Sequence, residues 1–192
     1  MLPSALALCK QPCAMPKNRY PAALLWLSSL LCTYSAHANL AIAAQYMPQP
    51  QMVGSTAYRV LFWDIYDATL YAPHGHWQAK QPYALRLTYH RDFSGTDIAA
   101  RSAEEMHQLG YANNAQLQRW QQQMQIMFPD VRTQSQLTGV RDAQGHAHFY
   151  HNKDYLGQIA DPDFSHWFFG IWLAPNTQEP SLRQALLGQT TR

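Results

Sequence analysis

Histidine spacing is the first feature of this sequence that could indicate chemistry. His146 and His148 are two positions apart in a short apolar run, so in a strand both side chains would lie on one face. Two imidazoles on one face are part of a ligand set for zinc or copper. His74, His76 and His151 border turn sequences, and no carboxylate or cysteine stands at a matched spacing. We therefore predict solvent-exposed histidines and no bound metal or cofactor.

Carboxylates close to an arginine are the second combination of residues that could do chemistry. Asp64 and Asp67 are near each other but beside an expected bend, so they do not identify an acid and base pair. Arg59 could pair with Asp64, Asp67 or Glu105 and so fasten a strand to a helix. The sequence has no Ser-His-Asp arrangement and no glycine-rich phosphate loop. These residues by themselves do not indicate a catalytic site.

Strands must position most of these side chains. Residues 58–71 are rich in β-branched and aromatic side chains and predict one long strand, bent or bulged near Asp64. Residues 83–90 alternate between apolar and polar, as expected of a half-buried antiparallel strand. Three further strand candidates are joined by tight turns: 133–140, 146–150 and 155–159.

Helices are expected between and after these strands. Ser94 is suited to cap a helix in which Ile98 faces inward. A second helix begins at Asn113 or Asn114 and stops before Pro129. Two more begin at Asp161 and Pro180, because proline suits the first helical turn. This order of elements predicts an α+β domain, an antiparallel β-sheet with helices packed on one face.

A targeting segment precedes this domain. Two basic residues stand before an apolar run over residues 22–34, which is followed by small residues at Ala36 and Ala38. This order is typical of a secretory signal peptide, and about 13 apolar residues are too few for a bilayer that needs about 20. We expect residues 1–38 to be removed by cleavage after Ala38. We also expect translation to begin at Met15, since the leader then has an ordinary length of about 24 residues.

Removal of the leader would change the composition of the chain. All three cysteines, Cys9, Cys13 and Cys32, lie in it, so the exported protein would have no disulfide and would depend on its core. The remaining chain is near neutral and has no basic cluster, which argues against nucleic acid as a partner. We expect a periplasmic or secreted protein without a membrane span, with a flexible lead-in over 39–53 and one domain over 54–188.

Several segments of the domain resemble the signature motifs of bacterial chalcone-isomerase-like proteins. The first reads G-x-x-x-x-R-x-L-F-W-D-x-Y-D-A-x-L-Y from Gly54 to Tyr71. The others are Leu85-Arg86-Leu87-Thr88-Tyr89, Leu156-Gly157-Gln158-Ile159, Ile171-Trp172-Leu173 and Leu186-Leu187-Gly188. Their common order extends the resemblance over nearly all of 54–188. It implies an open-faced β-sandwich, in which a curved antiparallel sheet carries helices on one side.

The resemblance also implies candidate site residues. Plant chalcone isomerases have an Arg and a Thr in this region and then a Tyr and an Asn on a helix, whereas fatty-acid-binding members keep the Arg and a Tyr. Arg59 and Tyr66 match the latter pair, while Ile98 and Glu105 stand at the two helix positions. Isoleucine has no donor for a developing enolate, and a carboxylate repels a phenolate. We therefore do not expect chalcone isomerase activity.

The expected function is non-catalytic binding of a small amphipathic carboxylate, such as a fatty acid, between sheet and helices. Arg59 and Tyr66 would hold the carboxylate, because a guanidinium and a phenol can both donate to it. Glu105 would lie nearby, and Ile98 and Met106 would contact the chain of the ligand. Two alternatives remain: an isomerase or lyase acting on an unknown enone, and an envelope interaction module without a small ligand, whose protein partner is unknown.

Overall fold

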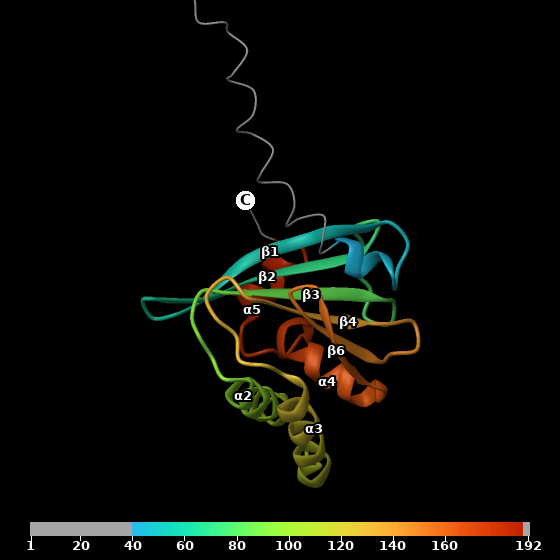
Figure 1. Cartoon of the computed structure of the whole chain (residues 1–192). Helices are drawn as coiled ribbons and strands as arrows, with labels where there is room; N and C mark the ends of the chain where they lie inside the picture. The colour runs from blue at the N-terminus through green and yellow to red at the C-terminus, as the bar shows by residue number, and fades with distance from the viewer. Residues whose placement is uncertain (1–39, 190–192) are drawn as a thin grey trace, which may run out of the picture. The chain divides into compact units, whose positions relative to one another are not determined.

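The computed structural model describes residues 40–189. The predicted leader, its expected start at Met15 and the expected cleavage site lie outside these residues. Six antiparallel strands form one sheet in the order of the chain (Figure 1). The strands are β1 (Pro50–Val60), β2 (Trp63–Pro73), β3 (Tyr83–Tyr89), β4 (Gln136–Arg141), β5 (Ala147–His151) and β6 (Asp154–Ile159). The predicted α+β class and antiparallel sheet are confirmed.

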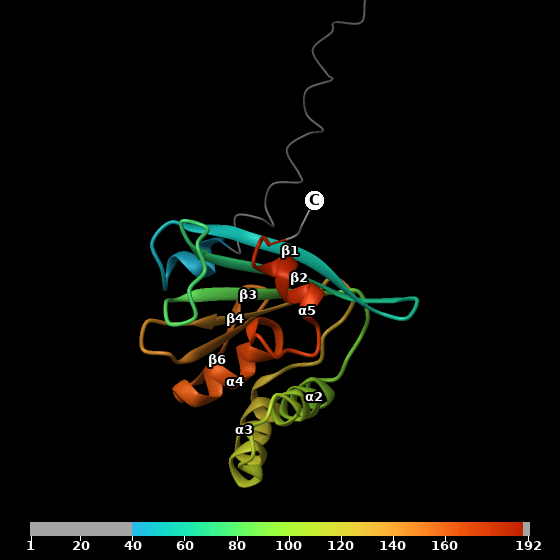
Figure 2. The ribbon, with the colours of Figure 1, turned by 180° about the vertical axis from the view of Figure 1, so that it is seen from behind.

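Four helices lie on one face of this sheet (Figures 1 and 2). They are α2 (Gly95–Gln108), α3 (Asn114–Met127), α4 (Pro162–Leu173) and α5 (Pro180–Leu186). The side chains of Ser94, Asn113 and Asp161 cap the first three of them, as the capping pattern predicted. The core forms where the apolar stripe of each helix meets the inward-facing residues of the strands, among them Leu70, Leu85 and Phe149.

The prediction of one long strand over 58–71 is wrong, although the register of strand pairing does shift next to Asp64. β1 and β2 form a hairpin whose turn consists of Leu61 and Phe62, and Val60 pairs with Trp63 across it. Leu61 has a φ of 54°, a backbone conformation that favours glycine or asparagine. The turn was not recognised in the sequence because two large apolar residues stand where such turn residues are expected.

The flexible lead-in predicted over 39–53 is also wrong for its described part. Residues 40–44 form a short helix, and β1 already begins at Pro50. Ile42, Ala43 and Met47 are buried against the sheet face opposite the four helices, on the side chains of Tyr71, Ala84, Val140 and Tyr150. This apolar contact, which depends on strands distant in sequence, orders the segment.

None of the helices among the described residues is long and apolar enough to cross a bilayer.

Candidate ligand-binding site

A cavity of about 550 Å³ lies between the helical face of the sheet, α2, α4 and the segment that leads into α5. Its size is within the range of sites for small organic ligands. Most of its wall is apolar and includes Ile65, Leu87, Ile98, Phe168, Ile171 and Leu182. On β3 the lining residues Leu87 and Tyr89 alternate, as residues on one face of a strand do. On β2 the consecutive Ile65 and Tyr66 both line the cavity, where the register of the β1–β2 pairing shifts.

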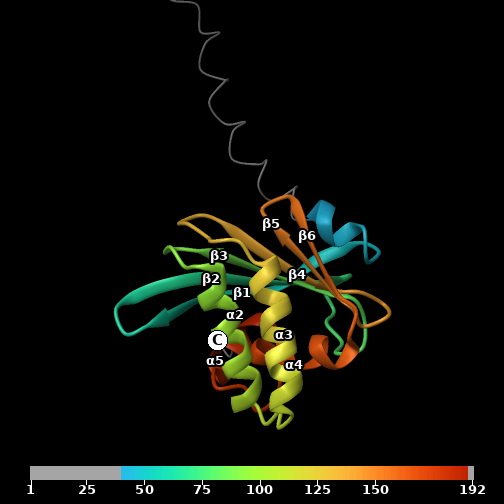
Figure 3. The ribbon, with the colours of Figure 1, turned by 60° about the horizontal axis from the view of Figure 1, so that its bottom comes forward.

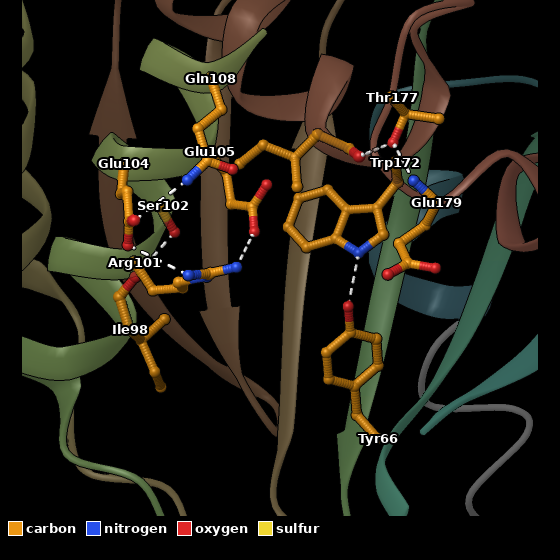
Figure 4. Close-up of polar contacts among 11 residues, drawn as sticks. Tyr66, Ile98, Arg101, Ser102, Glu104, Glu105, Gln108, Trp172, Thr177 and Glu179 are labelled. Carbon is orange, nitrogen blue, oxygen red and sulfur yellow. Dashed lines mark hydrogen bonds and ion pairs between the residues drawn. The ribbon is translucent and has the colours of Figure 1, made fainter. Parts of the chain in front are cut away.

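Tyr66 and Trp172 form a polar contact in this wall. The indole Nε1 of Trp172 donates a hydrogen bond to the Tyr66 hydroxyl at 3.0 Å (Figure 4). Burial raises the pKa of Tyr66 above its ordinary value, so the phenol stays neutral and keeps its own proton for donation. The ring of Tyr58 stacks on that of Tyr66 with centroids 5.1 Å apart. Two phenols therefore lie next to each other on the cavity wall.

Charged side chains from α2 form another part of the wall. Arg101 donates to Glu104 and Glu105, three and four positions further along the same helix (Figure 4). Burial lowers the pKa of Arg101, but the two carboxylates outweigh it and raise the value overall. Asp97 and Glu179 also line the cavity. Burial, followed by the charges of Glu179 and Glu105, raises the pKa of Tyr58. The polar part of the cavity is therefore rich in carboxylates, with Arg101 as the cation among its lining residues.

Three of the five predicted site residues lie at this cavity: Tyr66, Ile98 and Glu105. Met106 does not line it and is instead fully buried in the core. Arg59 does not line it either, and pairs with Asp64 at the exposed end of the hairpin. Tyr58 and Val60 face the cavity, so the intervening Arg59 points to the other side of the strand. Of the alternative partners for Arg59, the structure has Asp64, and this ion pair joins two strands and not a strand to a helix. Arg59 does not line the cavity with Tyr66.

A sequence model described as chalcone isomerase-like matches residues 49–188. The chain belongs to the chalcone isomerase-like family. An uncharacterized protein of Haemophilus influenzae is 29% identical over 141 residues, which cover 73% of this chain and 69% of that protein. A crystal structure of a fatty-acid binding protein of Arabidopsis thaliana superposes with a TM-score of 0.57 at 11% identity. The superposition covers 73% of this chain and 87% of the Arabidopsis chain. At this identity the likeness establishes the fold alone.

Sequence reasoning missed several lining residues of this chalcone isomerase-like protein. Arg101 is followed by Glu104 and Glu105, a spacing that is typical of an ordinary surface ion pair on a helix. Trp172 is an aromatic residue on the apolar face of α4, a position typical of core residues, and it both packs in the core and lines the cavity. Tyr58 and Val60 are two residues apart on β1 and both line the cavity. They were missed because the turn at Leu61 and Phe62 was not recognised, so a contribution from both strands of the hairpin was not expected.

The histidines were expected to be exposed, and this is wrong for His148. Its Nε2 lies 2.9 Å from Asp142 Oδ2 and its Nδ1 lies 3.3 Å from the Tyr155 hydroxyl, while only 9% of the residue is exposed. Asp142 belongs to the turn before β5, and the fold of that turn brings it to His148, which sequence spacing did not indicate. No group of three metal-ligating side chains is found among the described residues.

We predict that the buried pair of Asp142 and His148 makes the free energy of unfolding depend on pH in the acid range. Burial raises the pKa of Asp142, but hydrogen bonds from His148 and from the backbone of His146 outweigh it and lower the pKa below its ordinary value of 3.8. A depressed native pKa means that the stabilisation is present above about pH 4 and is lost as the pH falls through the native value. Urea unfolding of wild type and Asp142→Asn between pH 7 and pH 3 checks this.

The expected result is that the wild type loses free energy of unfolding below about pH 4, and that Asp142→Asn shows a shallower loss. Asparagine keeps the oxygen that accepts from the backbone nitrogens of Gln144 and His146. Parallel pH curves for the two proteins would show that the pair does not contribute.

Proposed function

We propose that this chalcone isomerase-like protein is an exported, non-catalytic carrier of a single-chain amphipathic lipid, such as a fatty acid. The observation that carries this proposal is the largely apolar cavity of about 550 Å³ with polar groups along part of its wall. An apolar cavity favours burial of a hydrocarbon chain, and a few polar groups orient its head. The solved structure of similar fold is of a fatty-acid binding protein, and this supports the proposal.

Arg101, in place of Arg59, is the head-group donor in this proposal. It is the cation that lines the cavity, and its side chain on α2 is 60% exposed, so that a ligand can reach the guanidinium. The carboxylate of a ligand would have to replace Glu104 or Glu105 as the partner of Arg101, which costs an existing ion pair. The hydroxyls of Tyr58 and Tyr66 can donate to the ligand without the loss of an ion pair. The affinity for a fatty acid therefore depends on how readily Arg101 exchanges one carboxylate for another.

We predict that Arg101→Gln weakens binding of a fatty acid by about tenfold, a loss of about 1.4 kcal/mol. The variant removes the cation and leaves Asp97, Glu105 and Glu179 to repel the ligand carboxylate. A fatty alcohol of the same chain length is expected to bind nearly as before. Titration calorimetry with both ligands provides the measurement.

Arg59→Gln is the matched control, since it removes a guanidinium that does not line the cavity. It is expected to bind both ligands as the wild type does. A loss of fatty-acid affinity in Arg59→Gln but not in Arg101→Gln would return the head-group role to Arg59.

The direct test of the function is mass spectrometry of protein purified without detergent, then denatured and extracted with organic solvent. A fatty acid or related single-chain lipid in a near-stoichiometric amount is the expected result. An empty extract from folded protein that also fails to take up added lipid would reject the proposal and favour the interaction-module alternative. Turnover of an enone substrate by the purified protein would favour the enzyme alternative.

Export is part of this proposal and has its own measurement. We predict that the protein recovered from cells begins at Asn39, because cleavage follows the small residues Ala36 and Ala38. The intact mass and the amino-terminal peptide of the protein from a periplasmic or culture fraction determine this. An amino terminus at Met1 or Met15 in the folded protein would contradict it.

A further inference from the structure

The end of the β1–β2 hairpin exposes a continuous set of large apolar side chains. We call residues 60–63 the hairpin tip. Leu61 and Phe62 are 86% and 97% exposed, and the flanking Val60 and Trp63 are 45% and 58% exposed. The pairing of β2 with β3 starts only at Tyr66, so the ribbon extends past the rest of the sheet (Figures 1 and 3). Such a cluster on a soluble surface is costly unless it meets an apolar partner.

The backbone of the tip also departs from what stability alone would favour. Leu61 has a positive φ, whereas Phe62 is not among the residues with positive φ. A two-residue turn of this kind favours glycine at the first position. Leucine there strains the backbone and exposes its side chain at the same time. Both costs are consistent with a tip whose side chains make a contact outside the molecule.

The chemistry of the tip matches the interfacial region of a lipid bilayer. Trp63 is the type of side chain that concentrates at that depth, and the guanidinium of Arg91 lies 4.2 Å from the centre of its ring. Arg59 is exposed on the strand directly behind the tip. Leucine and phenylalanine would enter the acyl region while the two arginines stay at the level of the phosphates.

The tip is also continuous with the cavity. Val60 belongs to the tip and, like Ile65 on the next strand, lines the cavity wall. A bilayer that receives the tip would therefore lie beside the cavity. A hydrocarbon chain could then move between the two along apolar side chains, without full exposure to water.

We propose that the hairpin tip inserts into the surface of a phospholipid bilayer and places the cavity beside it for exchange of lipid. The inference that the tip inserts into a bilayer depends only on the side chains of the tip. The inference that lipid is exchanged rests on the proposed lipid-carrier function. A protein partner or a second copy fits less well, because four residues at the end of a two-stranded ribbon offer much less area than the roughly 800 Å² per partner of a typical stable interface.

The test is flotation of the processed protein with vesicles of phosphatidylethanolamine and phosphatidylglycerol, all variants having the same amino terminus. The double variant Leu61→Gly with Phe62→Asn has a sequence that suits the turn, so it is expected to fold with an equal or higher melting temperature. Its vesicle-bound fraction is expected to fall at least tenfold. Neither residue lines the cavity, so its affinity for a fluorescent fatty acid in vesicle-free solution should not change.

Ile126→Gln is the matched control, because Ile126 on α3 is 89% exposed and lies outside the tip. It is expected to float like the wild type. Hydrogen exchange in the presence of vesicles should slow in residues 58–65 and not in α3. Equal flotation of the double variant and the wild type would overturn the proposal, as would a wild type that does not float.

Two further outcomes separate this inference from the proposed function. Wild type that floats but binds no fatty acid would leave insertion standing and reject the lipid carrier. Wild type that binds fatty acid and does not float, but forms dimers that the double variant loses, would assign the tip to self-association and overturn insertion.

Discussion

Replacement of Ile98 by tryptophan is expected to weaken lipid binding by roughly 100-fold while the protein stays folded. Ile98 lies on α2 with its side chain at the cavity and is only partly buried, so a larger side chain can enter the open space (Figure 4). An indole there would displace about four methylene groups of a bound chain. At about 0.8 kcal/mol per methylene, the loss is about 3 kcal/mol.

Gln108→Trp is the control for this prediction, since Gln108 is an exposed residue near the end of the same helix and does not line the cavity. It should bind a fluorescent fatty acid as the wild type does. Competition titrations on both variants, with circular dichroism to verify folding, make the comparison. Unchanged affinity in Ile98→Trp would show that the ligand does not occupy this cavity.

Gly54→Ala is expected to destabilise the protein by about 3 kcal/mol, at the upper end of the usual cost of overpacking. A Cβ at this position of β1 would overlap the carbonyl oxygen of Ala185 and lie 2.6 Å from that of Leu186. Backbone atoms of α5 cannot move aside as a flexible side chain can, so α5 would have to shift. Because Leu182 of α5 lines the cavity, a weaker lipid affinity should accompany the loss of stability.

The matched control is Gly170→Ala in α4. A Cβ there would make ordinary contacts, the nearest at 3.4 Å to Leu109 Cδ1. Alanine also favours a helix by up to about 1 kcal/mol over glycine, so this variant should be as stable as the wild type or slightly more stable. Urea denaturation of both variants gives the free energies of unfolding. A Gly54→Ala variant as stable as Gly170→Ala would mean that α5 does not approach β1 this closely.

Most of the elements could be predicted from the sequence because their signals are local. Ser94, Asn113 and Asp161 cap helices where the pattern placed them, since a capping side chain bonds to amides only two or three residues away. The strand at 83–89 is equally well marked, because its alternation reflects burial of one face. The order of these elements was sufficient for the fold class.

The hairpin shows where local signals fail. Nothing in Leu61-Phe62 favours a turn, so only the pairing of two whole strands, with Tyr58 opposite Tyr66, reveals that the chain reverses there. The segment around Ile42 is a similar case, because it is ordered by strands far along the chain. In both places the energy that decides the structure comes from long-range contacts.

In the candidate site, too, some features follow from local sequence signals and others from long-range contacts. The sequence was sufficient for the family resemblance, for the helix that carries Ile98 and Glu105, and for placing Tyr66 in a strand, and therefore for the general place of a cleft. That Arg59 lies outside this cleft follows from the register of the hairpin, which sets Arg59 opposite Asp64, and no local signal in the sequence gives that register. The position of Arg101 on the cavity wall could not be predicted either. It depends on which face of α2 packs against the rest of the protein, and this is set by tertiary contacts.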